Sequence, residues 1–161
     1  MLRQSFTYQL ASISEGAIGP AAKLFESRFG LDVHELRVLR LIDDQPGVTF
    51  TSLSKQTRFE RSATSRILSR LIKAGLVRRE NDEKDARQFR LNVTQKGKEL
   101  RERADPLSLE LEALILSTLT ASERLEFRRI LDKLSHWLDA KFIDELQARY
   151  PDAKQRRRGR G

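Results

Sequence analysis

The stretch from Thr49 to Thr94 constrains the fold of this chain more than any other, because two short helical patterns are followed there by two strand patterns. Residues 51–57 predict a short helix, and residues 61–74 predict a second helix that Gly75 ends. A bend of three residues separates the two helices, which is the connection found in a helix-turn-helix.

A hairpin follows the second helix directly. Residues 76–79 form its first strand, and in residues 89–93 apolar and polar side chains alternate as in a half-buried strand. The connecting loop, residues 81–87, is too long for a two-residue turn, so we expect it to project as a wing. The sequence therefore predicts a winged helix-turn-helix, a fold that is mainly α with a small β-hairpin wing.

Positive charge is concentrated on this stretch. The formal net charge is +8, yet residues 55–90 carry eleven Lys and Arg against five Asp and Glu, and residues 151–161 carry five against one. The rest of the chain is slightly acidic. A phosphate backbone is the natural partner of such a localised basic surface. A charge-rich surface without a nucleic-acid partner is the alternative, and charge alone does not decide between them.

The second predicted helix carries hydroxyl and basic side chains opposite its apolar stripe of Ala63, Ile67 and Leu71. Short hydroxyl side chains permit close approach to a groove, and hydroxyl and guanidinium groups donate hydrogen bonds to phosphates and bases. The face opposite the stripe comprises Ser62, Ser65, Arg66, Ser69 and Lys73, flanked by Arg61 and Thr64.

Arg87 lies near the tip of the predicted wing, where a guanidinium group can enter a minor groove. Asp85 stands two residues before it and can hold the arginine side chain in place. A solvated loop with an incidental ion pair explains the same two residues equally well.

Apolar stripes at helical spacing flank the winged stretch on both sides. Residues 5–29 predict a long helix with a kink or a break at Gly19 and Pro20, and Thr120 opens a C-terminal helix with a capping box. These stripes need a partner surface, which either a second copy of the chain or packing within one copy supplies. The predicted dimer-interface residues are Phe6, Leu10 and Ile13, together with Leu131, Leu134, Trp137, Leu138 and Phe142.

The remaining patterns complete the predicted organisation. A capping box at Asp32 and Glu35 opens the helix that leads into the winged stretch. A further helix from Thr94 toward Leu119 contains Pro106, which should bend or divide it. We therefore divide the chain into a helical dimerisation region of residues 1–30 and 100–147, a winged DNA-binding region of residues 31–99, and a disordered basic tail of residues 148–161.

Composition and motifs argue against several classes of function. The chain has no cysteine, so disulfides, Cys-ligated zinc and thiol catalysis are excluded. Neither a membrane span nor a signal peptide is evident, and we expect a cytoplasmic protein. The two histidines, His34 and His136, lie far apart, and no HExxH, phosphate-binding glycine loop or nucleophile elbow occurs. We therefore expect no catalysis, no metal and no cofactor.

Three motifs occur in a distinctive order: Arg61-Ser-Ala-Thr-Ser-Arg66, then Leu71-Ile-Lys-Ala-Gly-Leu-Val-Arg-Arg79, then Asp85-Ala-Arg87 followed by Leu91-Asn-Val-Thr-Gln-Lys-Gly97. With these motifs the chain resembles the MarR family of bacterial transcription regulators over residues 5–145. The departures are mild. Ser54 stands where the family usually has Ala, and Phe59-Glu60 precedes the second helix where many relatives have Asp or Ser.

The resemblance implies an obligate homodimer on double-stranded DNA. Each recognition helix would enter a major groove of a pseudopalindromic operator, with the wings in the flanking minor grooves. It also implies a repressor that a small aromatic ligand, phenolic or carboxylic, releases from DNA. The alternative is a winged-helix protein that binds proteins or shapes DNA without small-molecule control.

The resemblance also implies roles for individual residues. The DNA-binding set is Thr49, Thr51, Ser52, Arg61, Ser62, Thr64, Ser65, Arg66, Lys84, Asp85 and Arg87. The nominated ligand lining is Ser14, Ile18, His34, Arg37, Arg40 and Phe50. Within it, Arg37 or Arg40 is able to pair with a carboxylate. An ordinary surface or interface role remains the alternative for each lining residue.

Overall fold

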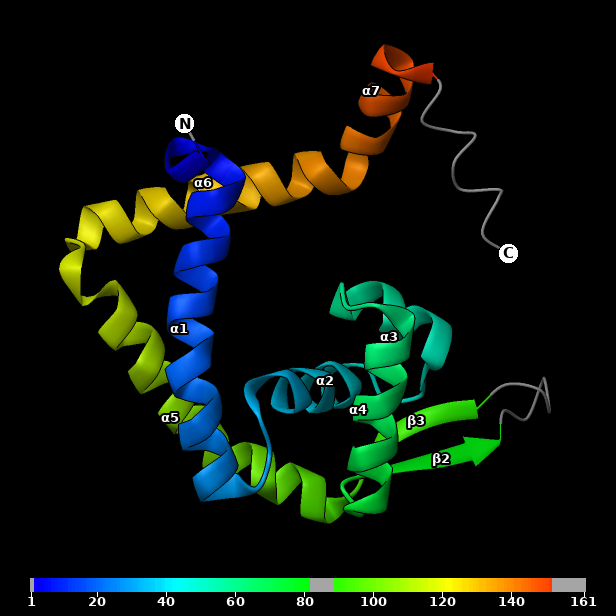
Figure 1. Ribbon diagram of the computed structural model, residues 1–161. Helices are drawn as coiled ribbons and strands as arrows, with labels where there is room; N and C mark the ends of the chain where they lie inside the picture. Colours follow the sequence, from blue (N-terminus) through cyan, green and yellow to red (C-terminus); the bar gives the residue numbers. More distant parts are fainter. Residues whose placement is uncertain (1, 82–88, 152–161) are drawn as a thin grey trace. The chain divides into compact units, whose positions relative to one another are not determined.

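A computed structural model describes residues 2–81 and 89–151 of the chain (Figure 1). It is mainly helical with a small antiparallel sheet, and it has the predicted winged helix-turn-helix fold. The chain forms two compact units, unit 1 (Met1–Leu114) and unit 2 (Ile115–Gly161). In chain order the elements are η1 (Leu2–Gln4), α1 (Phe6–Phe29), α2 (Val33–Asp44), β1 (Val48–Thr49), α3 (Phe50–Thr57), α4 (Arg61–Lys73), β2 (Val77–Asn81), β3 (Phe89–Val93), α5 (Gln95–Ile115), η2 (Leu116–Thr118), α6 (Ala121–Ala140) and α7 (Phe142–Arg149).

Side-chain caps begin the helices where the sequence predicts them. The Ser5 and Thr49 hydroxyls accept hydrogen bonds from backbone N–H groups in the first turns of α1 and α3. Asp32 and Glu35 complete both hydrogen bonds of a capping box at α2, and Thr120 begins α6 in the same way. Each cap satisfies N–H groups that have no partner within the helix.

The sequence predicts a kink or a break at each internal proline, and the structure has no break at either one. α1 continues through Pro20 and α5 continues through Pro106. A proline removes the hydrogen bond to the carbonyl four residues before it. Those carbonyls belong to Gly16 and Glu102, which are both exposed, so water can satisfy them. The single C-terminal helix that the sequence predicts is instead two helices, because α6 ends at Lys141 and α7 follows.

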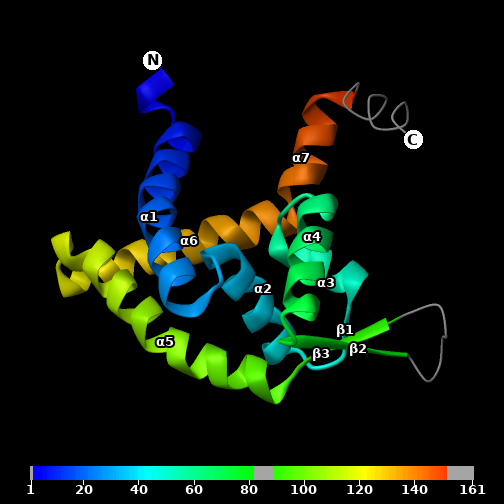
Figure 2. The same cartoon turned by 60° about the horizontal axis from the view of Figure 1, so that its bottom comes forward.

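The sheet has three strands where the sequence predicts two. β3 pairs with β2 along the hairpin, and on its other edge it pairs with β1, with Val48 opposite Leu91 and Thr49 opposite Arg90. Figure 2 shows β1 beside β3, near the start of α3. A strand of two residues has no readable periodicity, and it forms because its partner strand comes from more than forty residues away.

The core of unit 1 is built around α2, which packs against α1, α3, α4 and β3. Leu36, Val38, Leu39 and Ile42 of α2 are almost completely buried. Leu53 anchors α3 in the same core, as predicted. The other elements contribute Phe25, Leu31, Val48, Leu68, Leu71, Leu76, Val77, Leu91, Val93, Ala104 and Leu107.

Ion pairs connect α2 to the first half of α5. Arg101 Nη1 lies 2.7 Å from Asp43 Oδ2 and 2.8 Å from Asp44 Oδ1. Arg40 Nε donates to Asp105 Oδ1 at 2.8 Å. Burial by itself would lower the pKa of Arg101, but its hydrogen bonds to the two aspartates raise that pKa above its ordinary value. The Arg101 guanidinium therefore stays charged between the helices.

Unit 2 contains α6 and α7, whose apolar side chains are largely exposed. Leu125 is 74% exposed, and the ring centroids of Trp137 and Phe142 lie 5.5 Å apart at the junction of the two helices. Within the described ranges, no helix is both long and apolar enough to cross a membrane.

Candidate nucleic-acid interface

A buried hydrogen bond joins α3 to α4. The hydroxyls of Thr57 and Thr64 lie 3.0 Å apart, and neither side chain is more than 2% exposed. Arg58 follows α3 in the left-handed conformation with φ 56°, which turns the chain toward α4. These contacts fix the angle of α4 relative to α3.

Thr64 therefore does not contact DNA, and its assignment to the DNA-binding set is corrected. It faces the core together with Leu68 and Leu71, four and seven residues later. The predicted stripe placed Ala63 and Ile67 at the centre of the buried face, but both are only half-buried. Thr64 was assigned to the outer face because threonine is polar. In the structure its hydroxyl is buried and pairs with the hydroxyl of Thr57.

The outer face of α4 is exposed, as the recognition-helix prediction requires. Arg61, Ser62, Ser65 and Arg66 all have exposed side chains. Ser69 is also exposed, but its hydroxyl donates to the Ser65 carbonyl oxygen at 2.9 Å. Thr51 on α3 is exposed, while Thr49 and Ser52 are half-buried within the α3 cap. Exposure makes these side chains available, and DNA contact by them remains a prediction.

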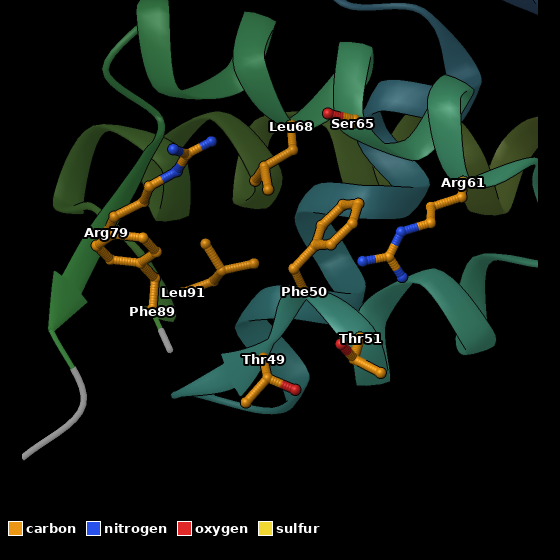
Figure 3. A pocket seen from close by; sticks show the side chains of 9 residues that line it. All are labelled: Thr49, Phe50, Thr51, Arg61, Ser65, Leu68, Arg79, Phe89 and Leu91. Carbon is orange, nitrogen blue, oxygen red and sulfur yellow. The ribbon is translucent and has the colours of Figure 1, made fainter. Parts of the chain in front are cut away.

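A hollow of about 630 Å³ separates α4 from the hairpin (Figure 3). The Arg61 guanidinium lies over the Phe50 ring, 4.8 Å from its centroid, and that of Arg79 lies 5.9 Å from the centroid of Phe89. The figure shows the two arginines on opposite sides of the hollow. The lining residues are Thr49, Phe50, Thr51, Arg61, Ser65, Leu68, Arg79, Phe89 and Leu91.

The hollow combines positive charge and hydroxyl groups with an apolar floor, an arrangement that suits an anionic partner. Sequence reasoning missed Arg79 and Phe89 as part of it. They occupy different strands, and the β2–β3 pairing brings them beside α4. Both residues lie on the predicted hairpin, and the charge count included Arg79, but neither residue was assigned a role.

The residues of the nominated ligand lining lie in different local surroundings, and their role as a ligand site remains a prediction. His34 and Arg37 gather around Phe59: the His34 ring is perpendicular to it at 5.0 Å, and the Arg37 guanidinium lies 5.5 Å from its centroid. Phe50 instead lines the hollow. Ser14 is exposed and Ile18 half-buried on α1.

Arg40, another residue of the nominated ligand lining, forms an ion pair with Asp105 of α5. Its guanidinium donates to Asp105 and to the Ser108 hydroxyl, so it already has a carboxylate partner within the chain. This partner lies 65 residues away in sequence, and no local pattern indicated it.

The wing residues Lys84, Asp85 and Arg87 lie outside the described residues, so their roles remain predictions from sequence. On β2, within the described part of the hairpin, Arg78 Nε lies 2.8 Å from Glu80 Oε1.

Substitutions at two neighbouring positions of α4 distinguish the buried Thr64 from the exposed Ser65. Thr64→Val should lower the free energy of unfolding by about 1–2 kcal/mol, because it leaves the buried Thr57 hydroxyl without its cross-helix partner. Ser65→Ala should leave that free energy nearly unchanged and weaken DNA binding instead. Urea denaturation and DNA titration measure the two effects, and equal unfolding curves for wild type and Thr64→Val would contradict the assignment.

Known proteins resemble this chain in sequence. The model of the MarR family matches residues 29–88. The HTH-type transcriptional repressor Rv2887 of Mycobacterium tuberculosis (strain ATCC 25618 / H37Rv) is 31% identical over 108 residues, which are 67% of this chain and 78% of that protein.

Solved structures share the fold. The crystal structure of Mycobacterium tuberculosis MarR family protein Rv2887 in complex with p-aminosalicylic acid has a TM-score of 0.68 and 26% identity, covering 81% of this chain and 98% of that one. The S. aureus MepR–DNA complex has a TM-score of 0.73 and 22% identity, covering 82% and 97%. At that identity the second likeness concerns the fold alone.

Proposed function

This chain belongs to the MarR family of transcription regulators, and from that premise we propose that it acts as a homodimeric repressor that binds a pseudopalindromic operator and is released by a small aromatic acid. The family consists of DNA-binding regulators and not of enzymes. The proposal goes beyond the family in three respects, namely the residues that contact DNA, the dimer and the effector.

One observation carries the DNA-binding part of the proposal. Arg61, Ser62, Ser65 and Arg66 are exposed together on the outer face of α4, while Thr64 on its inner face fixes the helix to the core. Residues 55–90, which contain this helix, carry eleven Lys and Arg against five Asp and Glu, whereas the chain outside them and the C-terminal eleven residues is slightly acidic. The relative Rv2887 is an HTH-type transcriptional repressor, which supports DNA as the partner here, and MepR, which shares the fold, was crystallised with DNA. We propose that Thr49, Thr51, Ser52 and the wing residues Lys84, Asp85 and Arg87 add contacts.

Exposed apolar side chains support a dimer. Phe6 is 53% exposed and Ile13 is 62% exposed on α1, and Trp137 and Leu138 are more than 40% exposed on α6. Apolar stripes of this kind are typical of surfaces that a partner covers. We propose that a second copy of the chain covers them, which would set the distance between two copies of α4.

The effector is proposed from the relative and from the hollow. Rv2887 was crystallised with p-aminosalicylic acid, an aromatic carboxylic acid. The hollow beside α4 offers the matching groups, since Arg61 and Arg79 lie near its aromatic side chains. An aromatic acid bound there would occupy arginines of the proposed DNA surface and compete with the operator.

Arg66→Ala tests the DNA-binding proposal. The wild-type protein first selects its preferred duplex from a random-sequence library, and affinities for that duplex and a scrambled one are then measured at several salt concentrations. Loss of an exposed arginine from the recognition surface should weaken binding to the selected duplex by about tenfold or more, and should flatten the salt dependence if the contact is to a phosphate.

Arg28→Ala is the matched control, because it removes an exposed arginine from α1 and should leave affinity unchanged. Sedimentation of the same samples should give twice the chain mass of 18.6 kDa. Salicylate should lower the wild-type affinity, whereas an architectural protein without small-molecule control would keep it. Equal affinity of the wild type for selected and scrambled duplexes would contradict sequence-specific binding.

A further inference from the structure

Glu35 is a buried carboxylate at the start of α2, with only 1% of its side chain exposed. Its Oε2 accepts a hydrogen bond from the Asp32 backbone at 3.0 Å, which is the side-chain half of the capping box. Its Oε1 lies 2.9 Å from Nε of Arg70, and among residues 2–81 and 89–151 this oxygen has no hydrogen-bond partner apart from that ion pair. Glu35 therefore connects the first turn of α2 to the last turn of α4.

The cap by itself does not explain the charge of this residue. Glutamine at the same position of a capping box accepts the same backbone hydrogen bond. Burying a carboxylate costs free energy that a neutral amide largely avoids, and here a single ion pair offsets it. What the negative charge adds is the ion pair with Arg70, which holds the Nε end of that guanidinium beside Glu35.

Arg70 keeps most of its surface free for another partner. Its side chain is 64% exposed although Nε lies against Glu35. It follows Arg66 by four residues, so both arginines occupy neighbouring parts of the outer surface of α4. Ser65 and Leu68 line the hollow toward the hairpin, whereas Arg70 reaches toward α2. α4 thus has one edge toward the hairpin, which carries Arg61, and one edge toward α2, which carries Arg70.

The dimensions of a helix in a groove give the second edge a partner. An α-helix with its side chains is about 10–12 Å wide, close to the roughly 12 Å width of the major groove. A recognition helix that fills the groove therefore has phosphates of one strand along one edge and phosphates of the other strand along the opposite edge. With the helix in the groove, Arg70 at the α2 edge would lie beside the phosphates of the second strand.

We propose that Arg70 binds a DNA phosphate at the α2 edge of the recognition helix, and that Glu35 is the positioning residue that orients it. This inference rests on the proposed DNA-binding function and adds to it a contact on the side of α4 away from the wing. The buried carboxylate holds the long arginine side chain before DNA arrives, so less conformational freedom is lost on binding.

A double-mutant cycle tests both statements with the duplex that the wild-type protein selects. Arg70→Gln should weaken binding on the order of tenfold, and the slope of log affinity against log salt should fall by about 0.9 for each subunit. Arg70→Lys keeps the charge but lacks the Nε atom that lies beside Glu35, so it should keep most of the slope with intermediate affinity. Arg103→Gln, which removes an exposed arginine from α5, is the matched control and should keep both the affinity and the salt slope of the wild type.

Glu35→Gln keeps the cap and removes the charge. It should weaken binding by about three- to tenfold with the salt slope unchanged, and it should have no such effect when Arg70 is already glutamine. A merely repulsive Glu35 would give the opposite sign, because its removal would strengthen binding to selected and scrambled duplexes alike. Thermal unfolding followed by circular dichroism confirms that each variant is folded.

The outcomes separate this inference from the function on which it rests. A wild-type protein that selects no duplex refutes the proposed function, and this inference with it. If the wild type binds a selected duplex but Arg70→Gln keeps the full salt slope, only the phosphate contact is refuted. If Glu35→Gln has the same effect with and without Arg70, the carboxylate does not act through the arginine.

Discussion

Gly97→Ala should lower the free energy of unfolding by roughly 2–3 kcal/mol, although alanine normally favours a helix. A Cβ at position 97 would overlap with the backbone carbonyl oxygen of Leu76 and lie 2.6 Å from Cγ1 of Val93. The carbonyl cannot move freely, because it accepts the hydrogen bond of the Thr94 N–H at 3.0 Å. The substitution therefore separates α5 from the junction between α4 and β2, and urea denaturation at fixed protein concentration measures the loss.

Gly16→Ala is the matched control for this effect. Gly16 also lies within a helix, but a Cβ there would meet no atom within 4 Å. Its replacement should stabilise the protein slightly, by up to about 1 kcal/mol, since glycine gives up more backbone freedom on folding than alanine does. If both substitutions moved the denaturation midpoint in the same direction, the close packing at Gly97 would not be what determines its stability effect.

Arg101→Gln should destabilise the protein by about 3 kcal/mol. The Arg101 side chain is 24% exposed and that of Asp43 18% exposed, so removal of the cation leaves a largely buried carboxylate without its ion pair. Asp44 loses the same partner, at 2.8 Å. Because these ion pairs attach α5 to α2, we expect faster amide hydrogen exchange in the first half of α5 as well as a lower denaturation midpoint.

Arg103→Gln provides the control, as it removes the same charge from the same helix two residues later, where the side chain is exposed. It should change the free energy of unfolding by less than about 0.5 kcal/mol. The double substitution Asp43→Asn with Arg101→Gln should recover part of the lost stability, because the buried charge is then removed together with its partner. A double variant as unstable as the sum of its single variants would argue that the two residues act independently.

Local patterns in the sequence were sufficient for the starts of the capped helices and for the outer face of α4. Capping residues such as Asp32 and Thr120 identify a helix start because they bond to backbone groups only three residues away. Ser62, Ser65 and Arg66 were placed on the exposed face because helical periodicity relates residues within one or two turns. Both kinds of signal act over a few residues, so one sequence is enough to read them.

Local patterns could not predict contacts between segments that lie far apart in the sequence. Thr64 was misassigned because the hydroxyl that satisfies it belongs to Thr57 on the preceding helix. The hollow could not be described before the hairpin placed Arg79 and Phe89 beside α4. The roles of Arg40 and Arg101 depended on partners far along the chain in α5 and α2.

The sequence by itself determined the order of the two helices and the hairpin in the winged stretch, the concentration of positive charge on residues 55–90 and the family to which the chain belongs. Only the tertiary structure decided which polar side chains of α4 face outward, which arginines are already paired, and that Glu35 reaches Arg70. The physical reason is one of range. Periodicity, capping and charge are properties of neighbouring residues, whereas burial and ion pairing are set when helices far apart in the chain pack around one core.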